Sequence, residues 1–408
     1  MGFFKAHTAY NVALIDVSSA SVRGAYVRIE EGKLPIIYYT AYLPIDPAID
    51  GSRPGDFPPT QMVACVESVA ERLMREGSPV LREATGSGQV KHILVSLGAP
   101  WQESAVRVET LQQEKPFLFT KALVETATRK NEIPEGKRES GEAVVATILN
   151  GYESRQPFGK RVKRADLVIL SSLLDATVAQ TVEKILRRVF HTHEVHVTAF
   201  APVAYEMLRD LYPHQSDFLV FDVAGTATDV VFVKNSLLID VRTLDIGVHD
   251  LLHAARSGGV VASGIVGIDS DSGGIIDPAR NARFASRASE VQAAWLTSLR
   301  ETLSDFSTRH PLPRTIFLLA DAETRDFLRR LLDSDPLRTL WLSEEPFSIV
   351  PVLSEQFSET VVFRGTATGD AYMAMLALYY ARHVAHLTEV IAQKPVAQPE
   401  TPEAPHST

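Results

Sequence analysis

Residues 218–244 read FLVFDVAGTATDVVFVKNSLLIDVRTL, and this stretch decides the fold. Its three apolar runs, FLVFDV, DVVFVK and LLIDVRTL, are rich in β-branched and aromatic residues and predict three strands. The small and polar turn AGTAT joins the first two runs, and a tight turn through Asn235 joins the second run to the third. Asp222 ends the first predicted strand, so a carboxylate stands at the start of the first turn.

The first thirty residues repeat this pattern in a shorter form. The apolar run VALID at residues 12–16 is followed by a polar turn at 17–21 and by the alternating run VRGAYVRI at 22–29. Asp16 ends the first run, at the place that Asp222 occupies in the later segment. Two such units in one chain predict a duplicated α/β fold with a cleft between its halves.

The segment between the two repeats predicts a separate module. Residues 91–176 read as strand, strand, helix, strand and strand, which is typical of a small inserted α+β domain. We therefore expect a first half made of residues 1–90 and 177–213, and a second half made of residues 214–390. Residues 391–408 are rich in Pro and polar residues and predict a disordered tail.

The composition describes a globular chain with more than one core. Of the 408 residues 45% are apolar, and 41 Lys and Arg stand against 50 Asp and Glu, a net charge of −9. A nucleic-acid partner is therefore not expected, because a phosphate backbone is bound mainly by clustered Lys and Arg. The basic segment 151–164, GYESRQPFGKRVKR, is interpreted as a solvated loop or hairpin rather than a nucleic-acid patch.

Cysteine content and hydropathy indicate a cytoplasmic location. The one cysteine, Cys65, excludes an intrachain disulfide and any zinc site built from paired cysteines, which fits a reducing compartment. No targeting peptide is expected at the N-terminus. The most apolar run, AYMAMLALYYA at residues 371–381, is shorter than the roughly 20 residues that cross a bilayer and predicts a buried helix.

The two turns carry the residues best suited to chemistry. Backbone N–H groups in turns of Ser, Thr, Gly and Ala can approach an anion closely, and the neighbouring hydroxyls add donors. A carboxylate at each strand end, Asp16 and Asp222, can bind magnesium directly or through water. The residues of each turn are also common in ordinary β-turns, so one turn alone does not indicate a phosphate site. The prediction depends on the two turns standing at matching positions of the two repeats.

At these residues the chain resembles the actin-like ATPases, and among them the FtsA and PilM proteins. The resemblance implies a duplicated, ribonuclease H-like ATPase fold that binds ATP and Mg²⁺, with the module beginning at HILVSLGAP as the small inserted domain of that group. It implies that Asp16 and Asp222 are the catalytic and metal-binding residues. The residues implied to bind the nucleotide are Ser18, Ser19, Ser21 and Arg23 in the first motif, Gly225, Thr226, Thr228 and Asp229 in the second, and Gly247, Ala320 and Asp321 beyond them.

Three departures from the family pattern bear on activity. Ser18 and Ala224 stand where the family has glycine, and Ala320 and Asp321 replace the Gly-Gly of the adenosine motif. Asp321 is also a suitable cap for the following helix. We expect at most a weak ATPase. A nucleotide-free pseudo-ATPase that acts as an interaction module stays open as an alternative. So does a sugar kinase or polyphosphate hydrolase of the same superfold, although no general base for a kinase is identified.

The resemblance also implies a role and a partner. FtsA and PilM proteins assemble or recruit membrane-associated machines, in cell division or type IV pilus assembly, through a short peptide of a partner protein and through possible self-association. No Lys, Arg or large apolar residue follows Lys394, so we expect no direct membrane anchor. This favours a PilM-like cytoplasmic scaffold that its partner recruits to the inner face of the membrane.

Overall fold

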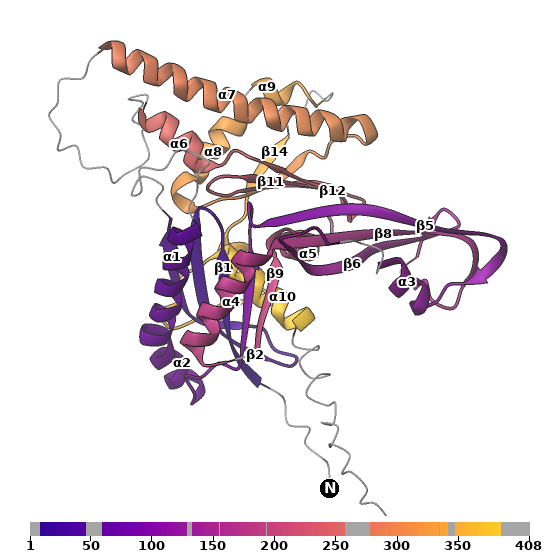
Figure 1. Ribbon diagram of the computed structural model, residues 1–408, viewed down its shortest axis with the longest axis horizontal. Helices are drawn as coiled ribbons and strands as arrows, with labels where there is room; N and C mark the ends of the chain where they lie inside the picture. Colours follow the sequence, from indigo (N-terminus) through magenta and orange to yellow (C-terminus); the bar gives the residue numbers. More distant parts are fainter. Residues whose placement is uncertain are drawn as a thin grey trace, which may run out of the picture.

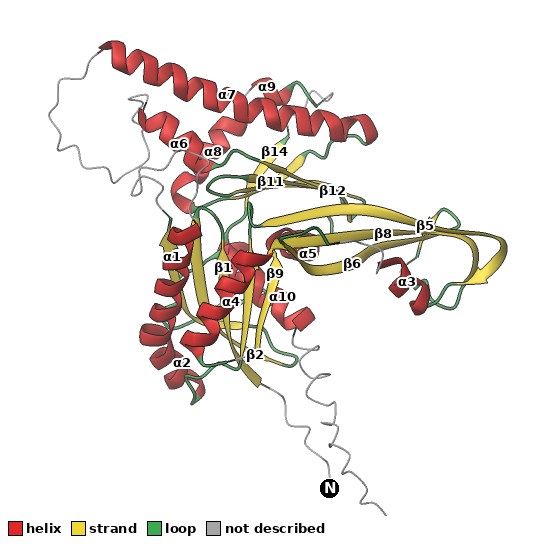
Figure 2. Ribbon diagram, viewed as in Figure 1, coloured by secondary structure: helices red, strands yellow, loops and turns green. Residues whose placement is uncertain are grey.

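The computed structural model describes eight stretches of the chain, which form three β-sheets and the helices around them (Figures 1 and 2). The described residues are 9–45, 59–128, 133–154, 156–192, 194–257, 278–333, 335–341 and 347–384. The expected tail at 391–408 lies outside them. No helix in these stretches is both long and apolar enough to cross a membrane.

The first sheet has the strand order β15-β3-β2-β1-β4-β9. Strand β2 runs antiparallel to β1 and β3, whereas β1, β4 and β9 are parallel. Its strands are β1 (Ala9–Val17), β2 (Ser21–Glu30), β3 (Ile36–Pro44), β4 (His92–Leu97), β9 (Glu194–Ala199) and the short β15 (Val362–Phe363).

The second sheet has the order β12-β11-β10-β13-β14. Strand β11 is antiparallel to β10 and β12, whereas β10, β13 and β14 are parallel. All residues of β10 are buried, as expected for a central strand covered on both faces. The strands are β10 (Phe218–Val223), β11 (Thr228–Lys234), β12 (Leu237–Leu244), β13 (Thr315–Leu319) and β14 (Ser348–Pro351).

The two sheets therefore repeat one topology. In each, a three-stranded antiparallel unit is followed by two parallel strands on the far side of its first strand. The carboxylates take equivalent positions, since Asp16 lies opposite Arg23 at the first hairpin and Asp222 lies opposite Asp229 at the second. The duplicated α/β fold predicted from the sequence is confirmed.

Helices cover the sheets and fill the space between them. Helix α4 shows why they form. Asp175 accepts a hydrogen bond from the Val178 amide as its N-cap, one helix face is buried, and His191 ends the helix in a left-handed conformation. The helices are α1 (Pro59–Arg72), η2 (Leu73–Gly77), α2 (Ser78–Thr85), α4 (Ala176–Phe190), α5 (Phe200–Leu211), α6 (Val248–Ser257), α7 (Pro278–Arg309), α8 (Ala322–Leu332), α9 (Asp335–Arg338), η3 (Ser354–Phe357), α10 (Ala371–Tyr379) and η4 (Tyr380–Val384).

Helices α5 and α10 join the two halves in one core. This core takes side chains from β1 and β2 of the first sheet, from β10, β11 and β13 of the second, and from both helices. Residues Ala371 to Leu378 of α10 are all buried, so the apolar run is a buried helix, as its composition predicts. The start of α10 brings Asp370 and Tyr372 to the place where the two sheets meet.

The inserted module begins later than the sequence indicates. Strand β4 pairs with β1 and β9 in the first sheet, so residues 91–97 belong to the first half and the expected boundary at residue 91 is wrong. The module has its own four-stranded sheet, β5-β8-β6-β7, and helix α3. In Figure 1 its long strands project from the body of the molecule. The elements are β5 (Gln102–Leu118), α3 (Lys121–Thr128), β6 (Lys137–Leu149), β7 (Tyr152–Glu153) and β8 (Arg161–Asp175).

Candidate functional site

The two predicted phosphate turns touch each other. The Thr226 amide, which the resemblance assigns to phosphate, donates a 3.0 Å hydrogen bond to Ser19 Oγ of the first turn. A Cβ added to Gly225 would lie 2.3 Å from the Ser19 carbonyl oxygen, so only glycine permits this approach. The groups expected to surround an anion are therefore in contact with one another.

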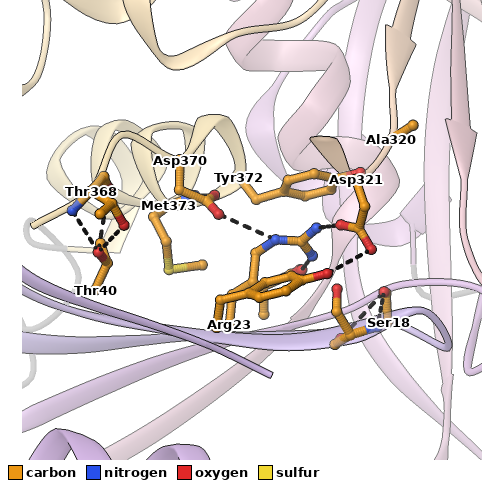
Figure 3. A network of polar contacts seen from close by, with 12 residues as sticks. Ser18, Arg23, Thr40, Ala320, Asp321, Thr368, Asp370, Tyr372 and Met373 are labelled. Atoms are coloured by element: carbon orange, nitrogen blue, oxygen red, sulfur yellow. Dashed lines mark hydrogen bonds and ion pairs between the residues drawn. The ribbon is translucent and has the colours of Figure 1, made fainter. Parts of the chain in front are cut away.

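Arg23 lies at the centre of a buried ionic cluster that joins the two halves (Figure 3). Its Nη1 donates to Asp16 Oδ2 at 3.1 Å and its Nε lies 3.3 Å from Asp370 Oδ2. Its Nη2 pairs with Asp321 Oδ1. The Arg23 side chain is only 4% exposed, so a guanidinium that is itself shielded from water binds three carboxylates. We call Arg23 and these three carboxylates the Arg23 cluster.

Two tyrosines enclose the Arg23 cluster. The guanidinium carbon of Arg23 lies 4.0 Å from the ring centroid of Tyr372 and 5.5 Å from that of Tyr42, both within cation–π range. The Tyr42 hydroxyl donates to Asp321 Oδ2 at 3.3 Å, and the Tyr372 hydroxyl donates to Asp222 Oδ1 at 3.1 Å. Tyr372 thus connects the Arg23 cluster to the carboxylate of the second turn.

Asp229 is bound at the root of the inserted module. Gln102 Nε2 and Thr243 Oγ1 each donate to its carboxylate at 2.6 Å. The side-chain oxygen of Gln102, Oε1, in turn accepts a hydrogen bond from the Ala201 amide at 3.1 Å, at the start of α5. Gln102, at the start of β5, therefore connects Asp229 of the second half to the N-terminus of helix α5.

Burial dominates the electrostatics of the turn carboxylates. It raises the pKa of Asp16 to about 6, against the opposing influence of Arg23 and the Ser96 hydroxyl. Burial also raises the pKa of Asp229 to about 6, against its hydrogen bonds from Thr243 and Gln102. Burial and the neighbouring carboxylates hold the pKa of Asp222 well above its usual range.

Most of the remaining predicted residues also contact groups of the protein. Ser18 Oγ accepts from the Ser21 amide at 3.2 Å and closes its own turn, and Thr228 Oγ1 accepts from Trp295 Nε1 at 3.1 Å. A Cβ on Gly247 would lie 2.3 Å from the Gly225 carbonyl oxygen. In the described part of the chain, the buried Ser21 hydroxyl has no hydrogen-bond partner.

The two residues expected in the adenosine motif, Ala320 and Asp321, contact arginines of the protein. The Ala320 carbonyl oxygen lies 3.4 Å from Arg325 Nη2. Asp321 stands at the N-cap of α8, yet its side chain makes no capping hydrogen bond, and the capping role expected of its carboxylate is not observed. The carboxylate points into the Arg23 cluster instead, as Figure 3 shows.

These contacts do not fit Mg²⁺ and ATP. The first-motif cation, Arg23, is neutralised by carboxylates, and the Thr226 amide is already bonded to Ser19. Among the described residues, no group of three or more His, Cys, Asp or Glu is arranged to hold a metal ion. The three acids that converge here surround a guanidinium.

Besides Ser96 and Thr243, which donate to Asp16 and Asp229, four residues of the site were not predicted from the sequence: Tyr42, Gln102, Asp370 and Tyr372. Only Asp370 had a local signal, because an Asp directly before a long apolar helix is a usual N-cap. Its Oδ1 does accept from the Met373 amide at 3.0 Å, while Oδ2 binds Arg23. The other three reach the site through tertiary contacts that a sequence pattern does not encode.

Comparison with known proteins identifies the fold. No model of a protein family matches the sequence, and no curated protein matches it. A chain of the PilM-PilN type IV pilus biogenesis complex aligns with a TM-score of 0.54 and 16% identity, over 90% of this chain and 97% of that one.

Two further solved structures align with lower TM-scores. A Bacteroides thetaiotaomicron protein with an actin-like ATPase fold aligns at 0.40 and 8% identity, over 92% and 98% of the two chains. An Aquifex aeolicus member of the Ppx/GppA family aligns at 0.34 and 15% identity, over 77% and 67%. Together, the repeated sheet topology and the match to the chain from the pilus complex show that this protein has the duplicated actin-like ATPase fold.

Proposed function

We propose that this protein is an actin-like scaffold of the PilM type, which binds a segment of a partner protein and whose two halves are joined by its own side chains instead of by a nucleotide. The observation that carries the proposal is the Arg23 cluster. It binds one side chain of the first half to carboxylates from the loop before α8 and from the start of α10. Of the sequence alternatives, this favours the nucleotide-free interaction module.

The Arg23 cluster suits a rigid platform better than a catalyst. Two of its pairs, with Asp321 and Asp370, cross between the halves. Removing one partner of a buried ion pair costs about 3–5 kcal/mol, so these two pairs oppose separation of the two halves. The shared core around α5 and α10 opposes it as well. In this proposal the angle between the halves is fixed, and the work of the protein is to bind a partner and present it.

The inserted module provides the binding surface in this proposal. Among the described residues β5 pairs only with β8, so the other edge of β5 has no strand beside it. Val108 on β5 is 59% exposed. An unpaired strand edge is a template on which an extended peptide can add a strand. The similarity to a chain from a PilM-PilN complex supports a protein partner, for which we propose a cytoplasmic peptide of an inner-membrane protein.

Removal of the inserted sheet tests this function. Ser104 Oγ and Ser172 Oγ lie 2.9 Å apart, so a short Gly/Ser linker can replace residues 105–171 and leave Gln102 and β4 in place. Synthetic peptides with the cytoplasmic tails of inner-membrane proteins of the host are titrated by fluorescence anisotropy. We expect at least one to bind the full chain saturably and not the shortened one.

A point variant on β5 tests the same surface in the full chain, so the test does not depend on whether the shortened chain folds. Val108→Lys changes an exposed residue of β5, and Leu34→Lys, at a residue that is 46% exposed in the first half, is its matched control. Val108→Lys should weaken peptide binding and Leu34→Lys should not. The proposed scaffold would be contradicted if no peptide bound the full chain. It would also be contradicted if a peptide bound the full chain, the shortened chain and both point variants equally.

A further inference from the structure

The far end of the inserted sheet exposes large apolar side chains. Tyr152 on β7 is 80% exposed, and Phe158 and Leu118 are each 49% exposed. They lie where β5 ends, where β6 turns into β7 and where β8 begins, which is the end of the projecting arm in Figure 1. We call this region, residues 112–121 and 149–164, the arm tip.

The arm tip is basic in an acidic protein. The segment 151–164 holds five Lys and Arg and one Glu, whereas the whole chain has a net charge of −9. Lys160, Arg161 and Lys163 are exposed, and within the described residues none of them is paired with a carboxylate. These cations are therefore available to an external anion.

Backbone and ring contacts hold the exposed groups in place. Phe158 stacks on the buried Phe119 with ring centroids 5.8 Å apart, and Lys121 Nζ lies 5.9 Å from the Phe158 ring centroid. The Phe119 amide donates to the Lys160 carbonyl oxygen at 2.9 Å, and Gly159 donates to the Phe119 carbonyl oxygen at 2.9 Å. Phe158 is thus fixed at the surface beside lysines.

We propose that the arm tip docks on the headgroup region of a bilayer that contains anionic lipids. Aromatic side chains with an apolar body favour the interface of a membrane, and Lys and Arg are attracted to anionic headgroups. The stem of a lysine can also lie against apolar surface while its ammonium stays hydrated. This is a peripheral contact of a few side chains and needs neither an anchor nor a membrane-spanning helix.

A planar bilayer fits the arm tip better than a nucleic acid. Lys160, Arg161 and Lys163 lie at the start of β8, and the arm that carries this strand projects from the body of the molecule in Figure 1. A flat surface can therefore meet this end of the arm without approaching the rest of the chain, which carries the negative charge. An extended polyanion would lie along more of the protein and meet that acidic surface.

Vesicle flotation tests the proposal with the full chain. Vesicles of phosphatidylcholine, with or without phosphatidylglycerol, are mixed with the wild type, Lys160→Glu/Lys163→Glu and Tyr152→Ser/Phe158→Ser. Arg329→Glu/Arg330→Glu, at exposed positions of α8, is the matched charge control. All six substituted residues lie at the surface, and circular dichroism checks that the variants fold.

Binding is expected only to vesicles with phosphatidylglycerol, and molar salt should remove it. Each basic residue near an anionic surface raises the partition coefficient about fivefold, so the Lys160/Lys163 variant should bind at least about 25-fold more weakly. The aromatic variant should also bind more weakly, and the α8 control should equal the wild type. Absence of wild-type binding, or equal binding of all variants, would overturn the proposal. So would single-stranded RNA binding with this variant pattern and no vesicle binding.

Discussion

Replacement of Arg23 by methionine is expected to destabilise the protein more than any surface change. Methionine fills a similar volume but leaves Asp16, Asp321 and Asp370 without their cation in a buried site. Breaking a buried ion pair in this way costs about 3–5 kcal/mol. For a chain of this size that corresponds to a fall in the melting temperature of roughly 6–10 °C, taking about 2 °C for each kcal/mol.

Differential scanning calorimetry with a matched variant measures the effect. Arg28→Met lies on the same strand, β2, where Arg28 is partly buried and donates to Asn11 Oδ1 at 3.3 Å. One such hydrogen bond contributes about 1 kcal/mol, so Arg28→Met should lower the melting temperature by only about 2 °C. Equal shifts for Arg23→Met and Arg28→Met would refute the reasoning.

The Arg23→Met defect should also depend on pH. Burial raises the pKa of Asp16 to about 6 in the wild type, and Arg23 opposes that rise. Without Arg23 the pKa of the folded state rises further, so the folded state binds this proton more tightly than the unfolded state does. The loss of stability should be largest above that raised pKa and smaller at pH 5 than at pH 7.5. A defect independent of pH would indicate lost packing instead of uncompensated charge.

Three further predictions concern the contacts around the two turns. Gly225→Ala places a methyl group against the Ser19 carbonyl oxygen and should lower the free energy of unfolding by about 1–3 kcal/mol in urea titrations; no change would mean that the turns do not touch. Gln102→Leu removes both the bond to Asp229 and the bond to the start of α5. It should cost about 1–3 kcal/mol in the same assay, whereas Gln112→Leu, at an exposed position of β5, should cost almost nothing. Because the pKa of Asp229 is raised to about 6, its contribution to stability falls as pH rises from about 4 to 6. Asp229→Asn should therefore remove about 1 kcal/mol of the difference between pH 5 and pH 7.5. An unchanged difference in this variant would contradict the buried, shifted carboxyl.

The duplicated fold could be predicted because its signals are local. Alternating apolar residues, turns of small residues and the acid at each strand end are all visible in segments of about thirty residues. The equivalent placement of Asp16 and Asp222 followed from them and is confirmed by the strand registers.

The module boundary was wrong because strand pairing is not local. The run HILVS reads equally well as the first strand of a module or as an inner strand of the first sheet. Only the parallel register of His92 with Val12 on one side and with Glu194 on the other assigns β4 to the first sheet. These partners lie about 80 and 100 residues away in the sequence, beyond the reach of any local pattern.

The chemistry of the turns was predicted less well than their position. The motifs indicated groups that can bind an anion, but a sequence motif does not show whether that anion is a phosphate or a carboxylate of the protein. Asp370 and Tyr372 come from α10, about 350 residues after Arg23 in the chain, and supply a carboxylate and a ring where the family resemblance implied a nucleotide. The sequence signals of this difference were Ser18 and Ala224 in place of glycine, and Ala320 and Asp321 in place of Gly-Gly. Asp321 is itself a member of the Arg23 cluster.

Isothermal titration calorimetry with ATP and magnesium tests the central claim most directly. If the Arg23 cluster and the contact between Thr226 and Ser19 occupy the nucleotide site, millimolar ATP with Mg²⁺ should give no saturable heat with the wild type. Saturable binding that is lost in a folded Asp222→Ala variant would contradict the account. It would show that the two turns separate to admit a nucleotide.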